Sequence, residues 1–160
     1  MNPKPTHVSE AVKMSWDAFA YDYFDSGWFH QERPKTALAV RHFYDKVPAA
    51  VLDKLAERKI ILFAPMPAIR GEVMPITTLK DTVLIYLSPK LESNSQRRVD
   101  ATVAHEFAHV FLGNYNWDHP DRKTPQGWKG EYREIPVEKA LHELLEEWGF
   151  EKPRKKKVKP

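Results

Sequence analysis

The stretch His105-Glu106-Phe107-Ala108-His109 places two imidazoles four residues apart, with a carboxylate next to the first. Four residues make about one turn of an α-helix, so both histidines project from the same face and can reach one metal ion. Glu106 then stands where the general base for a metal-activated water is needed. The spacing predicts a zinc site with His105 and His109 as ligands if the stretch is helical. The alternative is a pair of ordinary histidines on a half-buried helix.

The flanking residues predict this helix from Ser93 to Leu112. No proline interrupts the segment, and Gly113 follows as a C-terminal stop. Ser93, with Gln96 three residues later, predicts a capping box at the N-terminus. Apolar residues recur near the helical period, at Val99, Val103, Phe107, Val110 and Phe111.

A catalytic zinc ion normally has three protein ligands and one open position, so a third ligand is needed. The extended metzincin pattern requires a glycine and a third histidine where this chain has Leu112 and Tyr115, which excludes that pattern. Asp118 and His119, in the polar segment from Tyr115 to Arg133, are two candidates.

A second helix, from about Pro136 to Trp148, offers a better candidate. Proline suits the first turn of a helix, and Gly149 follows as a stop. Glu138 lies at the border of its apolar stripe, and we predict that Glu138 is the third zinc ligand. The alternative is a first-turn acid that complements the helix dipole.

The run from Thr102 to Gly113, followed by Val137-Glu138 and Trp148-Gly149-Phe150, resembles the compact gluzincin metallopeptidases, particularly the ImmA/IrrE type. The resemblance covers roughly residues 48 to 150. It implies an α+β, zincin-like fold, with a small, mostly antiparallel or mixed sheet packed on the HExxH helix and a second helix carrying Glu138. It also implies zinc-dependent hydrolysis of peptide bonds, by a regulatory protease with a narrow protein substrate.

One position departs from the family pattern. His142 stands where the family often has an aspartate that supports a ligating histidine from outside the metal shell. His142, Tyr115, Tyr132 and His119 are candidates for supporting the site or for stabilising a transition state, and the residues leave the choice open. The departure also allows a different class of function, a non-catalytic zinc-binding or protein-interaction module.

The other elements are predicted from apolar patterning and, upstream of the motif, from the resemblance. We expect helices over Ser9–Phe24, Thr36–Tyr44 and Pro48–Arg58, although Thr36–Tyr44 is ambiguous between helix and strand. We expect strands over Lys59–Ala64 and Thr82–Leu87. By the resemblance, the second strand is an edge strand beside the zinc helix, where an extended peptide adds as a further strand.

Length and composition predict one domain. The chain has 160 residues, of which 42% are hydrophobic, and no cysteine, so any metal must be held by nitrogen and oxygen ligands. We expect a single catalytic domain over residues 1–150, with an N-terminal helical part (1–47) and a catalytic core (48–150). No apolar run approaches the ~20 residues of a membrane span, so we expect a cytoplasmic protein without a membrane partner. The oligomeric state is not predicted.

The basic charge is concentrated at the C-terminus. Residues 151–160 hold six lysines and arginines against one glutamate, a net charge of +5, so residues 1–150 carry −2 of the total of +3. We expect this tail to be disordered. Its residues 152–159 are the only part of the chain that we expect to be able to bind nucleic acid. No aromatic residue is interleaved with the lysines, which argues against base stacking and favours a solvated tail.

Overall fold

The computed structural model describes residues 12–19, 33–57, 60–65, 71–75, 82–113 and 136–150. Within these ranges the α-helices are α3 (Pro34–Lys46), α4 (Ala49–Ala56), α5 (Gln96–Leu112) and α6 (Pro136–Glu147). The strands are β1 (Ile60–Pro65), β2 (Gly71–Pro75) and β3 (Thr82–Leu87), and a 3-10 helix, η1 (Pro89–Ser93), precedes α5. None of the described helices is long and apolar enough to cross a membrane.

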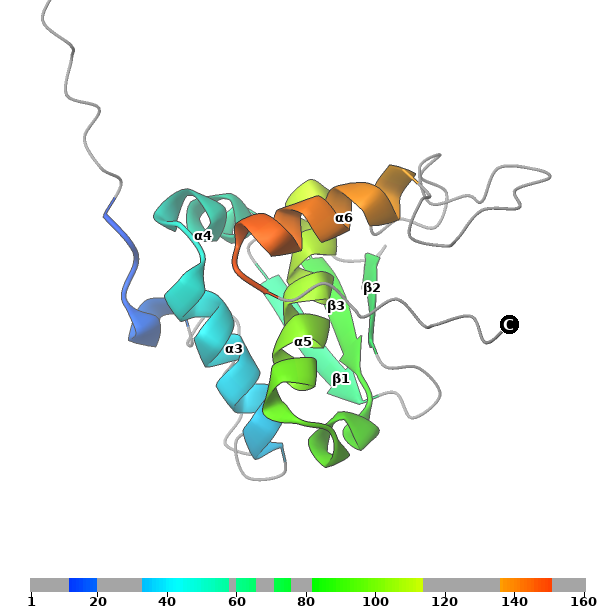
Figure 1. Cartoon of the computed structure of the whole chain (residues 1–160). Coiled ribbons are helices and arrows are strands. Elements are labelled where there is room, and N and C mark those ends of the chain that lie inside the picture. Colours follow the sequence, from blue (N-terminus) through cyan, green and yellow to red (C-terminus); the bar gives the residue numbers. More distant parts are fainter. Residues whose placement is uncertain are drawn as a thin grey trace, which may run out of the picture.

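Helix α5 is the centre of the described structure. It contacts α3 on one side, α6 and α4 toward its C-terminal end, and strands β2 and β3 behind it (Figure 1). Helix α6 crosses the C-terminal half of α5, which is the half that carries the two histidines of the motif (Figure 1). The HExxH helix is thus supported by packing on several sides.

The three strands form one mixed sheet in the order β1-β3-β2. Strand β3 pairs in parallel with β1, with Ile60 opposite Thr82, and antiparallel with β2, with Gly71 opposite Leu87. The prediction that β3 is an edge strand is wrong, because β3 lies in the middle. Among the described strands, an extended peptide would have to pair with β1 or β2.

The predicted α+β, zincin-like fold class also needs correction. The helices hold 13, 8, 17 and 12 residues, whereas the strands hold only 6, 5 and 6. The described part is mainly helical, and its sheet is limited to these three short strands. The physical reason is that proline limits the length of the strands. Two of the strands end at a proline, Pro65 and Pro75, which cannot donate a backbone hydrogen bond to the sheet. The long amphipathic segments have no internal proline and therefore form long helices.

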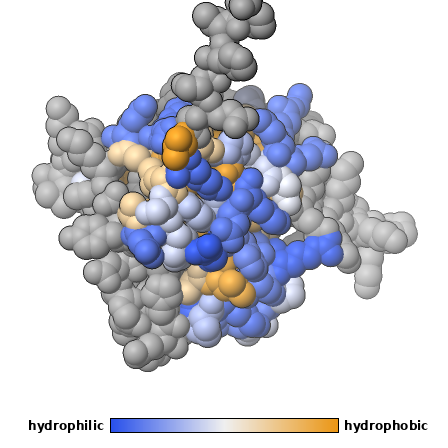
Figure 2. Space-filling view, turned by 90° about the vertical axis from the view of Figure 1, so that its left-hand side faces the viewer, coloured by the Kyte–Doolittle hydropathy of each residue, from blue (hydrophilic) through white to orange (hydrophobic). Residues whose placement is uncertain are grey.

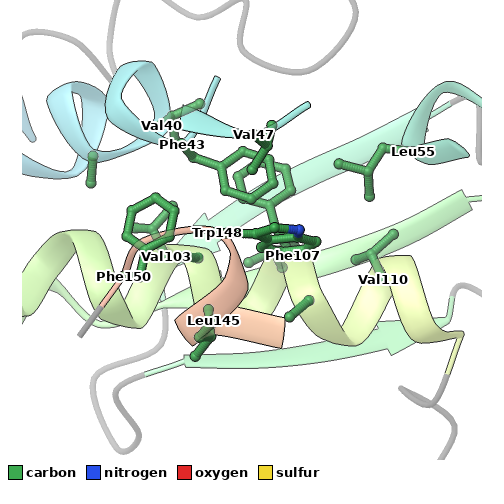
Figure 3. Packing of buried hydrophobic residues seen from close by; sticks show 14 of the residues in the cluster. Val40, Phe43, Val47, Leu55, Val103, Phe107, Val110, Leu145, Trp148 and Phe150 are labelled. Atoms are coloured by element: carbon green, nitrogen blue, oxygen red, sulfur yellow. The ribbon is translucent and has the colours of Figure 1, made fainter. Parts of the chain in front are cut away.

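A cluster of aromatic side chains fastens α5 to its neighbours (Figure 3). Phe107 of α5 stacks on Phe43 of α3, with ring centroids 4.2 Å apart and planes 8° from parallel. Trp148 and Phe150, which follow α6, also contact the ring of Phe43, at 5.5 and 6.3 Å. Phe107 lies between His105 and His109 in sequence, but the helical period places it about 160° around the helix from each of them. The core therefore holds one face of α5 and leaves the histidines on another.

The N-terminus of α3 is capped by a side chain from far along the chain. One carboxylate oxygen of Glu92 accepts hydrogen bonds from the backbone N–H and hydroxyl of Thr36, at 2.9 and 2.6 Å, and the other accepts from the backbone N–H of Lys35 at 2.9 Å. These contacts satisfy donors that a helix N-terminus leaves open, with a negative charge at the positive end of the dipole. They tie η1, just before the motif helix, to α3.

The start of α5 differs from the sequence prediction. The helix begins at Gln96 with Ser95 as N-cap and no capping side chain, so the predicted Ser93–Gln96 capping box is wrong. Ser93 ends η1 and donates to the carbonyl of Lys90. The amide of Gln96 donates instead to the carbonyl of Lys35 and to Asp100.

Most other element predictions are confirmed. Gly113 ends α5 in the left-handed region at φ 70°, and Gly149 follows α6 at φ 79°. The segments predicted at 36–44 and 48–58 are the helices α3 and α4, and the strand predicted at 59–64 is β1. Of the first helix predicted over Ser9–Phe24, residues 16–19 are helical, residues 12–15 are not, and residues 9–11 and 20–24 lie outside the described residues. Strand β2 was not predicted.

The face of the molecule on the α3 side is mainly hydrophilic (Figure 2). Its apolar spots are small and separate, and the exposed large hydrophobic residues of the described part are Val12, Leu38 and Leu112. The basic tail of residues 151–160 lies outside the described residues, as do residues 1–11 of the predicted domain.

Candidate metal centre

Helix α5 brings two imidazoles of the motif together. The ring centroids of His105 and His109 are 4.9 Å apart, and the ring planes are 81° from parallel. His109 is 4% exposed, whereas the side chain of His105 is 24% exposed. The pair has one nitrogen-donor group in the interior and one at the rim, which suits a metal ion that must remain accessible.

Helix α6 supplies the third donor. Glu138 lies in the first turn of α6 and is 3% exposed, and its Oε2 lies 3.9 Å from Nε2 of His105. A carboxylate is almost never this buried unless it is paired or coordinates a metal. Helices α5 and α6 therefore bring His105 and Glu138 together, although these residues are 33 positions apart in the sequence.

The geometry fits a zinc ion. One donor atom from each of His105, His109 and Glu138 lies within 4.8 Å of the other two. Ligands of a tetrahedral zinc at about 2.0–2.1 Å are about 3.4 Å from one another, so small side-chain rotations complete the site. In the part of the chain that the structure describes, this is the one group of three or more histidine and acidic side chains with such geometry.

Glu106 is also buried, with 5% of its surface exposed. The helical period places it about 100° around α5 from His105 and about 60° from His109, between the histidine face and the core face. Glu106 is not one of the three side chains whose donor atoms cluster. A carboxylate is one of the groups that can act as a general base.

His142 lies one turn beyond Glu138 on α6, and its ring centroid is 6.3 Å from that of His105. The structure places this sequence-predicted residue beside the cluster. The other candidates, Tyr115, Asp118, His119 and Tyr132, lie outside the described residues.

Sequence reasoning missed a polar network that links α3 to the N-terminal half of α5. His42 Nδ1 and Asp100 Oδ2 are 2.8 Å apart, and the other oxygen of Asp100 accepts from the amide of Gln96. Neither residue belongs to a recognisable motif, because the two lie 58 positions apart and meet only through packing. The network helps to fix the helix that carries His105 and His109.

Comparison with known proteins adds no relative: no family model, no curated protein and no solved structure matches this chain. The resemblance to gluzincins therefore rests on the motif residues themselves.

Proposed function

We propose that this protein is a zinc-dependent peptidase whose metal is held by His105, His109 and Glu138. The observation that carries the proposal is the convergence of these three donors from α5 and α6 within 4.8 Å, next to the buried Glu106. A structural zinc site would normally be closed by a fourth protein ligand and would have no use for Glu106.

Zinc and Glu106 would have different roles in the hydrolysis of a peptide bond. A bound zinc ion supplies a Lewis acid that lowers the pKa of water toward ~7 and polarises a carbonyl group. Glu106 takes a proton from the attacking water as the new C–O bond forms, and it delivers that proton to the leaving nitrogen as the C–N bond breaks. Water and one peptide bond are consumed, and one carboxyl and one amino terminus are produced.

The charges of the site agree with this role. Two neutral imidazoles and one carboxylate around a divalent cation leave a net charge of +1 at the metal. This charge attracts the carbonyl oxygen of a peptide and the negative charge that develops on it during attack. The substrate class that we propose is a peptide or an extended segment of a protein, including the narrow protein substrate of a regulatory protease.

The test is a comparison of wild type with Glu106→Gln. Both proteins should contain zinc, because Glu106 is not a ligand, but the variant should lose ~10²–10⁴-fold in hydrolysis of a peptide library followed by mass spectrometry. Glu143→Gln, an exposed glutamate on α6, is the matched control and should cleave normally. Full zinc content without cleavage in wild type would favour a non-catalytic zinc-binding module.

A further inference from the structure

Arg98 lies on the same face of α5 as the two histidines. It is seven residues before His105 and eleven before His109. At 100° per residue, both spacings leave it within about 20° of the histidines around the helix axis. At 1.5 Å per residue, it is about 10.5 Å from His105 along the axis. The face of α5 that carries the two nitrogen donors therefore also carries a guanidinium group, about two turns earlier.

This guanidinium group is accessible to a ligand. Arg98 is exposed, and no carboxylate of the described residues lies within ion-pair distance of it. The two acidic residues nearest to it in the sequence have other partners, because Glu92 caps α3 and Asp100 contacts His42. Helix α6 crosses the C-terminal half of α5, whereas Arg98 is in the first turn (Figure 1). The positive charge of Arg98 is thus left open to an acidic group from another molecule.

The stability of α5 does not explain an arginine at this position. The N-terminus of a helix is the positive end of its dipole, where a cation is unfavourable and an acidic residue is favourable. The first turn of α5 holds Arg97 and Arg98 and no acidic residue. A charge that does not help the helix is better explained by a role in binding.

We propose that Arg98 binds a carboxylate of the substrate and selects peptides with an acidic group about three residues from the cleaved bond, an inference that rests on the proposed function. Arginine and a metal-bound histidine extend to similar lengths from a helix, so the guanidinium group and the metal are separated by roughly the same 10.5 Å. An extended peptide rises about 3.3 Å per residue, so three residues span this separation. A guanidinium group donates two parallel hydrogen bonds to a carboxylate, which belongs to an Asp or Glu side chain or to the C-terminus of the peptide.

The first test compares the cleavage of peptides that differ only in this group. The zinc-loaded full chain is incubated with a peptide library that has Glu or Gln at each position, with free or amidated C-termini, and the products are identified by mass spectrometry. Wild type should prefer the acidic peptides by about 3–10-fold in kcat/KM, mainly through KM, which lies between the effects of an exposed ion pair and of a hydrogen bond between charged groups. The amidated peptides distinguish a side-chain carboxylate from a terminal one.

Three variants assign the preference to one residue. Arg98→Gln should lose the preference and cleave neutral peptides at the wild-type rate, and Arg98→Glu should prefer peptides with Lys at the same position. Arg97→Gln is the matched control, because Arg97 is also an exposed arginine but lies about 100° further around α5. It should keep the preference. Arg98→Gln should also melt at or above the wild-type temperature, because it removes a cation from the positive end of the helix.

The second test measures binding without catalysis. Fluorescent acidic and amide-matched peptides are titrated with Glu106→Gln protein, which retains the three proposed metal ligands, and anisotropy is recorded at low and high salt. The acidic peptide should bind about 3–10-fold more tightly at low salt, and the difference should shrink at high salt because salt screens an exposed pair. Adding Arg98→Gln to this protein should remove the difference.

The outcomes separate the role of Arg98 from the proposed function. Cleavage by wild type without a preference for acidic peptides, or a preference that survives in Arg98→Gln, would overturn the role of Arg98 and leave the peptidase intact. Binding of acidic peptides that depends on Arg98, without cleavage by wild type, would support Arg98 and overturn the peptidase. Neither binding nor cleavage would overturn both.

Discussion

Replacing Glu138 by glutamine should reduce the stability that the protein gains from zinc, while it leaves the stability of the metal-free protein nearly unchanged. Glu138 is the one donor from α6 and the one carboxylate in the cluster of three, and both histidines come from α5. A metal ion bound by all three, as we propose, would therefore link α6 to α5. Glutamine keeps the shape of the buried side chain and removes its charge. Without metal, we therefore expect the free energy of unfolding of the variant to lie within about 1 kcal/mol of the wild-type value.

The magnitude follows from linkage. Free zinc at 100 times the dissociation constant stabilises the folded state by about 2.7 kcal/mol. For a chain of this size each kcal/mol shifts the melting temperature by about 2–4 °C, so wild type should gain roughly 5–11 °C. If the variant binds 100-fold more weakly, the same zinc concentration adds only about 0.4 kcal/mol, or about 1–2 °C.

The assay is thermal unfolding with chelator and with zinc, for wild type, Glu138→Gln and the exposed control Glu143→Gln. The control should show the full zinc-dependent shift. The reasoning is refuted if Glu138→Gln gains as many degrees from zinc as wild type, because the third ligand would then have to be another residue.

Three further predictions concern the frame of the site and the tail. Phe107→Ala removes a fully buried ring stacked on Phe43 and should cost about 3–5 kcal/mol in the free energy of denaturant unfolding; a loss no larger than that of Leu112→Ala, at an exposed position, would contradict the packing. Glu92→Ala removes the cap of α3 and should cost about 1–2 kcal/mol in the same measurement, whereas Glu57→Ala, at an exposed position, should cost little. Deleting residues 151–160 should leave zinc content and peptide cleavage unchanged, and any salt-dependent binding of nucleic acid by the full chain should disappear; a loss of zinc would assign the tail a role in the site.

Helices could be predicted from this sequence where the apolar pattern is long. α5 and α6 follow the helical period over three turns or more, and Gly113 and Gly149 mark where they end. The N-terminus of α5 was less predictable, because Ser93 has the residue type of a cap and is used to end η1. Local sequence does not distinguish these two uses of a serine.

The sheet was harder to predict because strand order depends on contacts between distant residues. β2 is only five residues long and begins and ends with Gly71 and Pro75, which are poor strand formers. Without β2, nothing in the sequence shows that β3 lies in the middle of the sheet. The network of His42 and Asp100 has the same origin, since only the packing of α3 on α5 brings the two side chains together.

One part of the candidate site could be predicted from local sequence, and another part depends on tertiary packing. The spacing of His105 and His109 is local, so a helix was enough to predict that they share a face. The proximity of Glu138 depends on how α6 crosses α5, which the sequence indicated only through the apolar stripe of the second helix. Only the tertiary structure shows that Nε2 of His105 and Oε2 of Glu138 lie 3.9 Å apart.

Elemental analysis of the purified protein tests the central claim most directly. Protein from zinc-supplemented growth, freed of loosely bound metal, should contain about one zinc per chain, as expected for a mononuclear three-ligand site. The double variant His105→Ala/His109→Ala should contain none, while His42→Ala, which alters a histidine outside the cluster, should retain the metal. Metal-free wild type, or equal zinc in wild type and the double variant, would contradict the account.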